Sequence, residues 1–401
     1  MKILQINVVY KEKSTGRTCL EVKRALEARG HEAYVAFGKG KHKDENTYRI
    51  GSDIEYYIHN IMARITGFQG YFSYFATRRL ITYIGKTAPD IIHLRNLHAN
   101  YLNLPLLFKY LEGANIPVIL NLHDCWAFTG KCAYFTDKQC FKWKTGCSDC
   151  PTKKSYPQSW FFDRTSKQYN DKKKWFANIE DLTVVGVSEW TTNQAKMSFL
   201  SNREVLTIYN WIDRNVFYPR KENILEQYGV DSTKFIILGV SASWIPGSPR
   251  YDDFIMVSDL VGDNMQIVLV GQTTVRQFPN NVKHIPFISD TEELAKLYSS
   301  ADVYVHLSTE DTFGKVVAEA MACGTPAVVY NSTALPELIE DGCGYIVEPR
   351  DINSIMRSIT EVMHLGKAYY SDNCIANVAK NFDFSKNTAK LISLYERIAH
   401  I

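Results

Sequence analysis

The sequence contains no run of about 18 apolar residues, so we expect no helix that spans a membrane. The N-terminal stretch MKILQINVVY has no cleavage site and passes directly into a strand pattern, which argues against a signal peptide. The net charge is only +3, too small to indicate a nucleic-acid-binding protein. What remains is ordinary: 401 residues, 45% of them hydrophobic and 22% charged, predict a globular chain of roughly two to three domains.

A secreted disulfide framework is not expected, because the nine cysteines follow no secretion signal. Some of them are clustered between residues 132 and 150 with the spacing C-x7-C-x6-C-x2-C: Cys132, Cys140, Cys147 and Cys150. Thiolates grouped in this way suit a tetrahedral structural Zn²⁺, which would hold a long loop but leave no open position for catalysis. Reduced cysteines that serve only packing are the alternative interpretation.

Short apolar strands alternate with helical segments through the whole chain. The strands are expected at residues 3–9, 33–37, 90–94, 118–122 and 183–187, and again at 235–240, 266–270, 302–307, 327–330 and 342–347. This alternation predicts an α/β protein with two doubly wound parallel sheets that face each other across a cleft. The expected boundaries are an N-terminal domain at 1–208, a linker at 209–219, a C-terminal domain at 220–382 and a final helix at 383–401.

The most informative segment is STEDTFGKVVAEAMACGTP, residues 308–326. A helix is expected to begin near Gly314, directly after a buried strand, and its first N–H groups and dipole favour an anion. Asp311 precedes the first turn and Glu319 follows it. A phosphate held by backbone donors, with carboxylates beside it to accept from hydroxyls, fits a nucleotide-diphosphate sugar.

This segment resembles the donor-site motif of the retaining glycosyltransferases of family 4, with seven residues between its acids and Phe313-Gly314 between them. Asp311 stands where the family has Glu, which keeps the charge but shortens the side chain. The resemblance implies that Asp311 contacts the hydroxyls of the donor sugar and that Glu319 binds the ribose. It also implies that Thr312, Phe313 and Gly314 present main-chain N–H groups to phosphate or sugar.

The resemblance extends over nearly the whole chain. Residues 210–219, NWIDRNVFYP, are similar to the link between the family's two domains, and 187–188 to a strand end of its first domain. The stretch from 121 to 151 is similar to a bacterial subgroup of capsule, colanic-acid and O-antigen synthesis. The implied fold is GT-B, in which the last helix crosses back to the first domain, and the implied protein is a retaining hexosyltransferase.

Several donor-site residues follow from the resemblance. Members usually carry Arg and Lys-Gly in the loop after the first strand of the second domain, but here residues 243–250 have no lysine and their only cation is Arg250. Arginine can replace lysine as a phosphate ligand. Gly271 matches a glycine where the nucleotide approaches closely, and Phe287 lies in the segment that reads the base.

Residues 14–18 follow the first strand and resemble the family's glycine loop, which lies at the acceptor side of the donor's diphosphate, so Gly16 and Arg17 are predicted to bind the donor. Gly16 would permit a tight turn, Arg17 would add positive charge and Thr15 would lie toward the acceptor. His123, at a strand end, resembles a histidine that faces the donor sugar and acceptor, and His98 is assigned to the acceptor side. We therefore predict His123, Asp311 and Glu319 as the residues closest to the chemistry.

The expected partners are a GDP- or UDP-linked sugar and a glycan or lipid-linked acceptor, with no nucleic acid and no catalytic cofactor. Because residues 153–175 are rich in basic and aromatic side chains, they could lie on an anionic leaflet or, equally, form a solvated helix. The expected location is cytoplasmic, at the inner face of the membrane. The alternatives are a nucleotide-sugar-binding protein without turnover, which the missing lysine favours, and a sugar-nucleotide epimerase, which would need no acceptor.

Overall fold

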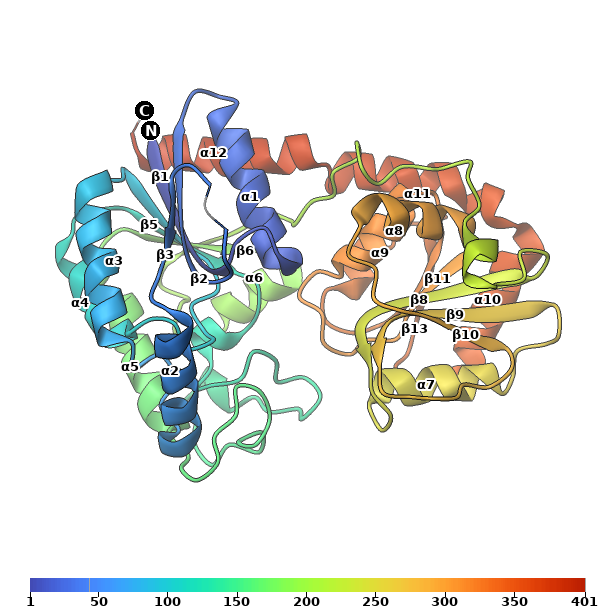
Figure 1. Ribbon diagram of the computed structural model, residues 1–401, viewed down its shortest axis with the longest axis horizontal. Helices are drawn as coiled ribbons and strands as arrows, with labels where there is room; N and C mark the ends of the chain where they lie inside the picture. Colours follow the sequence, from blue (N-terminus) through green and yellow to red (C-terminus); the bar gives the residue numbers. More distant parts are fainter. Residues whose placement is uncertain (43, 401) are drawn as a thin grey trace. The chain divides into compact units, whose positions relative to one another are not determined.

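The computed structural model describes residues 1–42 and 44–400 and divides into two compact units. Unit 1 comprises Met1–Ile208 together with Thr388–Ile401, and unit 2 comprises Tyr209–Asn387. Figure 1 shows a sheet with helices around it in each unit. In the described part of the chain, no helix has the length and apolar character needed to cross a membrane.

Unit 1 is built on a parallel sheet with the strand order β3-β2-β1-β4-β5-β6-β7. Every neighbouring pair is parallel, and the central strands are buried apolar runs that need cover on both faces. The strands are β1 (Lys2–Val9), β2 (Glu32–Lys39), β3 (Thr47–Arg49), β4 (Ile91–Leu94), β5 (Val118–Leu122), β6 (Leu182–Gly186) and β7 (Glu204–Thr207).

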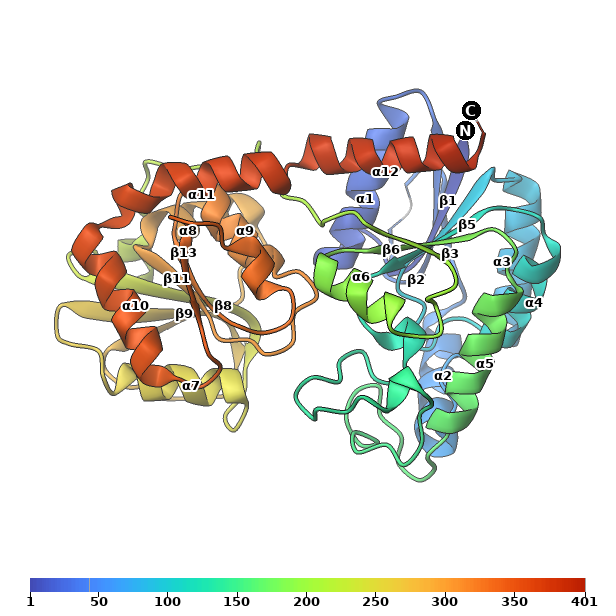
Figure 2. The ribbon, with the colours of Figure 1, turned by 180° about the vertical axis from the view of Figure 1, so that it is seen from behind.

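Helices cover this sheet: α1 lies on one face, and α3, α4 and α5 lie on the other (Figures 1 and 2). They are α1 (Lys13–Glu27), α2 (Asp53–Thr66), α3 (Tyr74–Thr87), α4 (Leu104–Gly113), α5 (Thr165–Asn178) and α6 (Glu189–Lys196), with the C-terminal part of α12 (Phe384–Ile398). The ends follow local signals: a Ser52–Glu55 capping box begins α2, and Gly67 in the left-handed conformation ends it.

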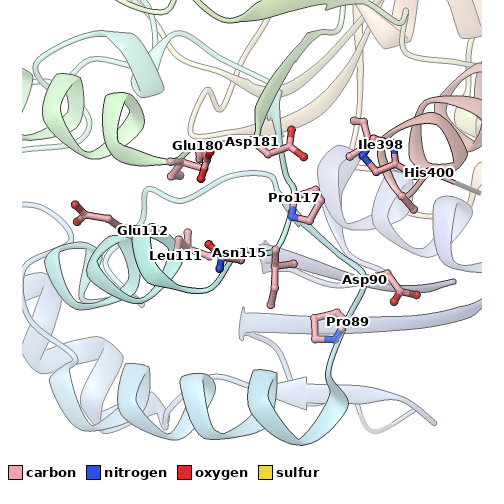
Figure 3. Close-up of a pocket in the computed structure, with 13 residues that line it drawn as sticks. Pro89, Asp90, Leu111, Glu112, Asn115, Pro117, Glu180, Asp181, Ile398 and His400 are labelled. Carbon is pink, nitrogen blue, oxygen red and sulfur yellow. The ribbon is translucent and has the colours of Figure 1, made fainter.

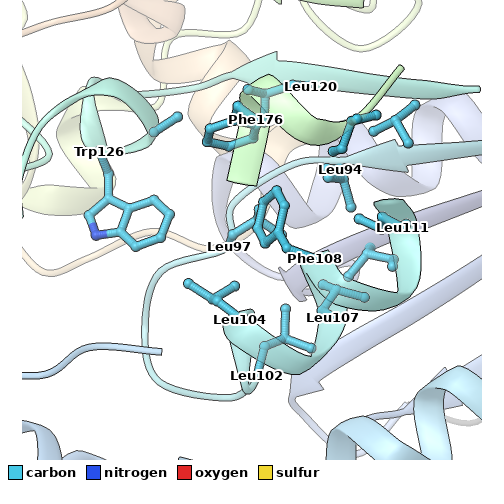
Figure 4. Packing of buried hydrophobic residues seen from close by; sticks show 14 of the residues in the cluster. Leu94, Leu97, Leu102, Leu104, Leu107, Phe108, Leu111, Leu120, Trp126 and Phe176 are labelled. Carbon is cyan, nitrogen blue, oxygen red and sulfur yellow. The ribbon is translucent and has the colours of Figure 1, made fainter. Parts of the chain in front are cut away.

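The core of unit 1 lies between the sheet and helices α4 and α5 (Figure 4). Leu107, Phe108 and Leu111 repeat at helical spacing and form the buried face of α4. Phe108 meets Phe176 of α5 edge to face, with ring centroids 4.9 Å apart. Aromatic rings prefer this edge-to-face arrangement, which stabilises the pair beyond the burial of its surface.

Unit 2 repeats the plan with a parallel sheet in the order β10-β9-β8-β11-β12-β13. Its strands are β8 (Phe235–Trp244), β9 (Met265–Thr273), β10 (Val282–Ile285), β11 (Val303–His306), β12 (Ala327–Tyr330) and β13 (Gly344–Val347). Its helices are α7 (Pro249–Ser258), α8 (Thr291–Ser300), α9 (Lys315–Ala322), α10 (Ile352–Leu365) and α11 (Lys367–Asn381). Helix α7 packs against α10, and α9 packs against α8 and α11.

Short 3-10 helices complete the described elements: η1 (Trp126–Phe128), η2 (Lys142–Lys144), η3 (Leu225–Tyr228) and η4 (Leu335–Leu338). The prediction of two doubly wound parallel-sheet domains is confirmed. The C-terminal helix is anchored in unit 1, where Tyr395 Oη lies 2.6 Å from Nδ1 of the fully buried His93. This hydrogen bond joins residues far apart in sequence.

Candidate functional site

The predicted donor-site segment forms a strand–loop–helix turn in unit 2. Strand β11 ends at His306 and helix α9 begins at Lys315, after Gly314 with φ +86°. A Cβ at residue 314 would lie 2.7 Å from the side chain of Leu335, so both conformation and space require glycine. The helix start predicted near Gly314 is therefore found there, and Val317 N donates to Gly314 O at 2.9 Å in its first turn.

Arg250 lies in this site. It is the second residue of α7, and its guanidinium donates to Ser241 Oγ at 2.9 Å and to Ser308 Oγ at 2.6 Å. A terminal nitrogen of Arg250 is 3.9 Å from Asp311 Oδ2. The two serines come from β8 and from the loop after β11, so they fix the arginine beside the predicted sugar-binding carboxylate.

Asp311 is held by a hydrogen-bonded chain that sequence reasoning did not identify. Nε2 of His306 lies 2.9 Å from Asp311 Oδ2, and Nδ1 of His306 lies 3.2 Å from Tyr304 Oη. Burial alone would raise the pKa of the Asp311 carboxyl, but His306 and Arg250 outweigh it and hold that pKa below its ordinary value. Asp311 is therefore a fixed carboxylate at neutral pH, which suits a group that accepts hydrogen bonds from sugar hydroxyls.

Glu319 lies on α9 with its side chain buried, and the hydroxyl of Tyr298 donates to Oε2 at 3.4 Å. Burial raises the pKa of Tyr304 well above its ordinary value. The positive charge of Arg250 lowers this pKa, and the negative charges of Asp311 and Glu319 raise it. These opposing effects place Tyr304, Arg250 and both acids in one electrostatic cluster.

The other predicted donor-site residues have different surroundings. Phe313 is buried and its ring packs against Phe382 at 5.4 Å between centroids, while Thr312 is also buried. Their main-chain groups, and not their side chains, are what a ligand could meet. Phe287 follows β10 and is 54% exposed, as a residue that touches a nucleotide base could be.

Gly271 is required by the packing of two strands, and its predicted closeness to the nucleotide stays a prediction. It lies inside β9, with φ +145°, and a Cβ there would be 2.1 Å from the carbonyl oxygen of Ser241 on β8. The close approach of two strands therefore already requires glycine at this position, before any nucleotide is considered.

The prediction that residues 14–18 form a loop is wrong, whereas the binding roles predicted for Thr15, Gly16 and Arg17 stay predictions. Helix α1 begins at Lys13, so Thr15, Gly16 and Arg17 lie in its first turns. Gly16 is buried, and its position would bring a Cβ within 3.2 Å of Lys11 N, so it serves the close packing of the helix start against the end of β1. Asn7 Nδ2 reinforces this joint by donating to Thr15 O at 3.3 Å.

The acceptor-side histidines line one hollow at the carboxyl ends of β4 and β5, together with Asn96, Asp124 and Trp126. His98 is bridged between Asp124 Oδ2, 2.7 Å from Nε2, and Tyr156 Oη, 2.9 Å from Nδ1. His123 Nε2 lies 3.2 Å from Asn121 Nδ2. Parallel α/β sheets bind ligands at this end of their strands.

The buried Lys172 contacts Trp126, one of the residues that line this hollow. The Nζ of Lys172, on α5, donates to the carbonyl of Trp126 at 2.6 Å and lies 3.8 Å from the centre of its ring. Burial lowers the pKa of Lys172 to about 7, against the charges of Cys147, Cys132 and Asp124. Sequence reasoning treated Lys172 as part of a basic surface, because a charge pattern does not reveal that one lysine of a run is buried.

The prediction of a structural zinc ion is not supported. Among residues 1–42 and 44–400, no group of three or more His, Cys, Asp or Glu side chains is placed so that it could hold a metal ion. Other contacts hold the 132–150 loop: Lys131 Nζ donates to the carbonyls of Thr152, Lys153 and Ser155. Trp143 adds a buried aromatic core by packing against Phe128 and Phe135.

A wider hollow of about 580 Å³ lies at the opposite end of the strands of the unit 1 sheet (Figure 3). Its lining includes Asp90, Glu112, Glu180 and Asp181, and it contains no predicted site residue. Carboxylates repel a diphosphate, and this is the amino end of β4, β5 and β6. The hollow is therefore not a candidate for the donor.

Comparison with known proteins identifies the family and the fold of the chain. The model of the family described as Glycosyltransferase Family 4 matches residues 15–216, and that of Glycosyl transferases group 1 matches residues 250–381. The chain is 24% identical over 386 residues to the Escherichia coli K12 protein named for colanic acid biosynthesis, the glycosyl transferase WcaC, covering 89% of this chain and 90% of that one.

Two solved structures show the same fold. Sucrose-phosphate synthase from Thermosynechococcus elongatus has a TM-score of 0.73 at 17% identity, covering 99% of this chain and 98% of that one. Anabaena HepE, solved in complex with UDP-glucose, has a TM-score of 0.67 at 16% identity, covering 99% of this chain and 100% of that one.

Proposed function

The chain belongs to glycosyltransferase family 4, and on this basis we propose that it transfers a sugar from a nucleotide-diphosphate sugar to a glycan or lipid-linked acceptor with retention of configuration. The relative named for colanic acid biosynthesis favours a role in bacterial surface polysaccharide synthesis. The observation that carries the proposal is the cluster of Arg250, Asp311 and the start of α9 in unit 2.

The donor diphosphate would be held by the guanidinium of Arg250 and the first N–H groups of α9. Charge builds up on the leaving phosphate in the transition state, and fixed positive donors stabilise it without reorganisation. Ser241 and Ser308 hold Arg250 in place before the ligand arrives. The lysine that is missing from residues 243–250 is thereby replaced by an arginine with a fixed orientation.

The donor sugar would be oriented by Asp311, whose carboxylate His306 fixes from the side of the sheet. Glu319, one helical turn into α9, would accept from the ribose hydroxyls when its contact with Tyr298 gives way. HepE was solved with UDP-glucose, which makes UDP-linked donors the first to test, with GDP-linked donors alongside.

The acceptor would meet His123 and His98 in unit 1, where Asp124 and Tyr156 set the orientation of His98. In the retaining reaction proposed here, the acceptor oxygen forms a bond to the anomeric carbon as the bond to the diphosphate oxygen breaks. The hydroxyl proton passes to the departing phosphate on the same face, so no separate carboxylate base is required. A lipid-linked acceptor would bring the protein to the inner face of the cytoplasmic membrane.

The test is a panel of UDP- and GDP-sugars with the unmodified protein, Asp311→Asn and Asp372→Asn as a surface control on α11. We expect release of nucleotide diphosphate from one donor, a loss of about 10²–10³ in kcat/KM for Asp311→Asn, and no change for the control. Tight nucleotide-sugar binding without turnover would instead favour a binding protein. Conversion of the donor sugar without acceptor would favour an epimerase.

A further inference from the structure

Helix α2 carries its large apolar side chains on its exposed face. Its buried residues are His59 and Ala63, which are polar and small. Its outer face carries large apolar side chains at positions i, i+4, i+8 and i+11, with Tyr57 beside them: Ile54, Tyr57, Ile58, Met62 and Ile65. Ile54 is 71% exposed and Ile58 is 54% exposed. A contiguous apolar stripe on an exposed face indicates a site of interaction with another molecule or with a membrane.

A loop of aromatic residues continues this surface. Trp160, Phe161 and Phe162 are all exposed, and Trp160 N donates to the carbonyl of Arg64, near the end of α2, at 2.7 Å. The carbonyl of Phe162 closely approaches Gly67, the residue that ends α2. The stripe of α2 and residues 160–162 together form the α2 patch.

Basic side chains accompany these aromatic rings. The guanidinium of Arg64 lies 5.8 Å from the centre of the Trp160 ring, and that of Arg164 lies 5.1 Å from the centre of the Phe162 ring. Lys153 Nζ donates to the carbonyl of Phe161 at 3.2 Å. The rings and the cations are therefore held together at one surface.

The nearby carboxylates are already engaged within the protein. Glu55 pairs with Arg79, and Asp53 pairs with Arg49. Asp163 accepts from the backbone of Cys150 and from Thr165, and these contacts outweigh burial in lowering its pKa. The charge that the α2 patch presents outward is therefore positive.

We propose that the α2 patch docks on an anionic phospholipid bilayer. Apolar and aromatic side chains would enter the interface between headgroups and acyl chains, while Arg64 and Arg164 would meet lipid phosphates. A second copy of the chain is a poorer match, because a twofold contact would bring two copies of the same positively charged patch together. The inference rests on the proposed function in one respect: a lipid-linked acceptor is presented at such a surface.

This surface differs from the helix that the sequence suggested. In α5, the side chains of Tyr169, Lys172 and Phe176 are buried in unit 1. The basic and aromatic composition of residues 153–175 therefore divides into a buried helix face and the exposed residues 160–162 that precede it.

The experiment is flotation of the full-length protein with phosphatidylcholine vesicles, alone and mixed with phosphatidylglycerol. The anchor variant carries Ile58→Gln and Phe161→Ser, and the charge variant carries Arg64→Gln and Arg164→Gln. The matched control, Met256→Gln with Leu260→Gln, removes comparably exposed apolar side chains from unit 2.

We expect the unmodified protein and the control to bind the anionic vesicles, and to bind phosphatidylcholine alone more weakly. The anchor variant should bind about tenfold or more weakly. The charge variant should lose about fivefold for each arginine on anionic vesicles. Added salt should weaken binding of the unmodified protein, which keeps the charge argument testable even where a variant fails to fold.

The proposal is overturned if the unmodified protein does not float with anionic vesicles, or if a folded anchor variant floats as well as the control. Light scattering that shows a dimer in the unmodified protein and a monomer in the anchor variant would assign the patch to a second copy instead. Failure of the proposed function is distinguishable, because vesicle binding needs no turnover. Protein that floats yet cleaves no nucleotide sugar would refute the transferase and leave the docking surface standing.

Discussion

Replacing Arg250 by alanine tests the donor site most severely, because the chain has no lysine in residues 243–250 to take its place. The guanidinium is fixed by Ser241 and Ser308 and lies 3.9 Å from Asp311. Loss of one preorganised donor to a transition-state anion costs about 10²–10³ in rate, or roughly 3–4 kcal/mol. We expect Arg250→Ala to lower kcat/KM for the donor by this factor.

Arg250→Lys separates charge from geometry. A lysine keeps the positive charge, but its single ammonium cannot span two serines and face a diphosphate as a planar fork does. We expect an intermediate loss of about tenfold. The removal of positive charge in Arg250→Ala should also raise the pKa of Asp311, which Arg250 helps to lower, and so move the acid limb of the pH–rate profile to higher pH.

The assay is initial-rate release of nucleotide diphosphate over a range of donor concentrations and pH. Arg357→Ala is the control, because Arg357 also donates to a serine in unit 2 but lies exposed on α10. Full turnover by Arg250→Ala, with an unchanged pH profile, would show that the phosphate charge is met elsewhere and would refute the reasoning.

Three further predictions concern other parts of the chain. Tyr395→Phe should destabilise unit 1 by about 1–3 kcal/mol in urea unfolding, because it removes the hydrogen-bond partner of His93 Nδ1. The other nitrogen of this buried ring, Nε2, already lacks a partner. As the control, Tyr369→Phe changes an exposed ring and should have little effect. Asp124→Asn should raise the KM for the acceptor about tenfold, because it removes the charged partner of His98, and it should leave the donor affinity measured by calorimetry unchanged. A change in donor affinity alone would contradict the assignment of His98 to the acceptor side. The pKa of Lys172 falls from 10.5 to about 7 on folding, so between these pH values the unfolded chain binds more protons than the folded chain, and the free energy of unfolding should rise with pH. Relative to Lys172→Met, this rise should reach up to about 2 kcal/mol from pH 7 to pH 9. The same pH dependence of stability in both proteins would contradict a neutral buried amine.

The fold was predictable because its signals are local. Buried strands such as 118–122 are short apolar runs with helices between them, and that alternation has few solutions. The start of α9 was predictable for the same reason, since Gly314 and the helix-forming run after it are adjacent in sequence. The short strands β3, β7 and β10, which lie at the edges of the two sheets, were not predicted. Helix α1 begins at Lys13, so residues 14–18 are helical where a loop was expected.

The site was less accessible because its partners are distant in sequence. His306 reads as one more residue of a buried strand, and only the folded chain brings it to Asp311 and Tyr304. Arg250 lies at the start of α7, and its sequence position did not reveal its partners Ser241 and Ser308. The cysteine spacing suggested a metal, whereas buried Lys131 and aromatic packing hold that loop.

The central claim is that the diphosphate of a nucleotide sugar is bound by Arg250 and the first turn of α9. A crystal structure of the protein soaked with UDP- and GDP-sugars tests it most directly. We expect phosphate oxygens within hydrogen-bonding distance of the Arg250 guanidinium and the backbone of residues 313–315, with the sugar hydroxyls on Asp311. A nucleotide sugar bound elsewhere, with Arg250 still engaged only by Ser241 and Ser308, would contradict it.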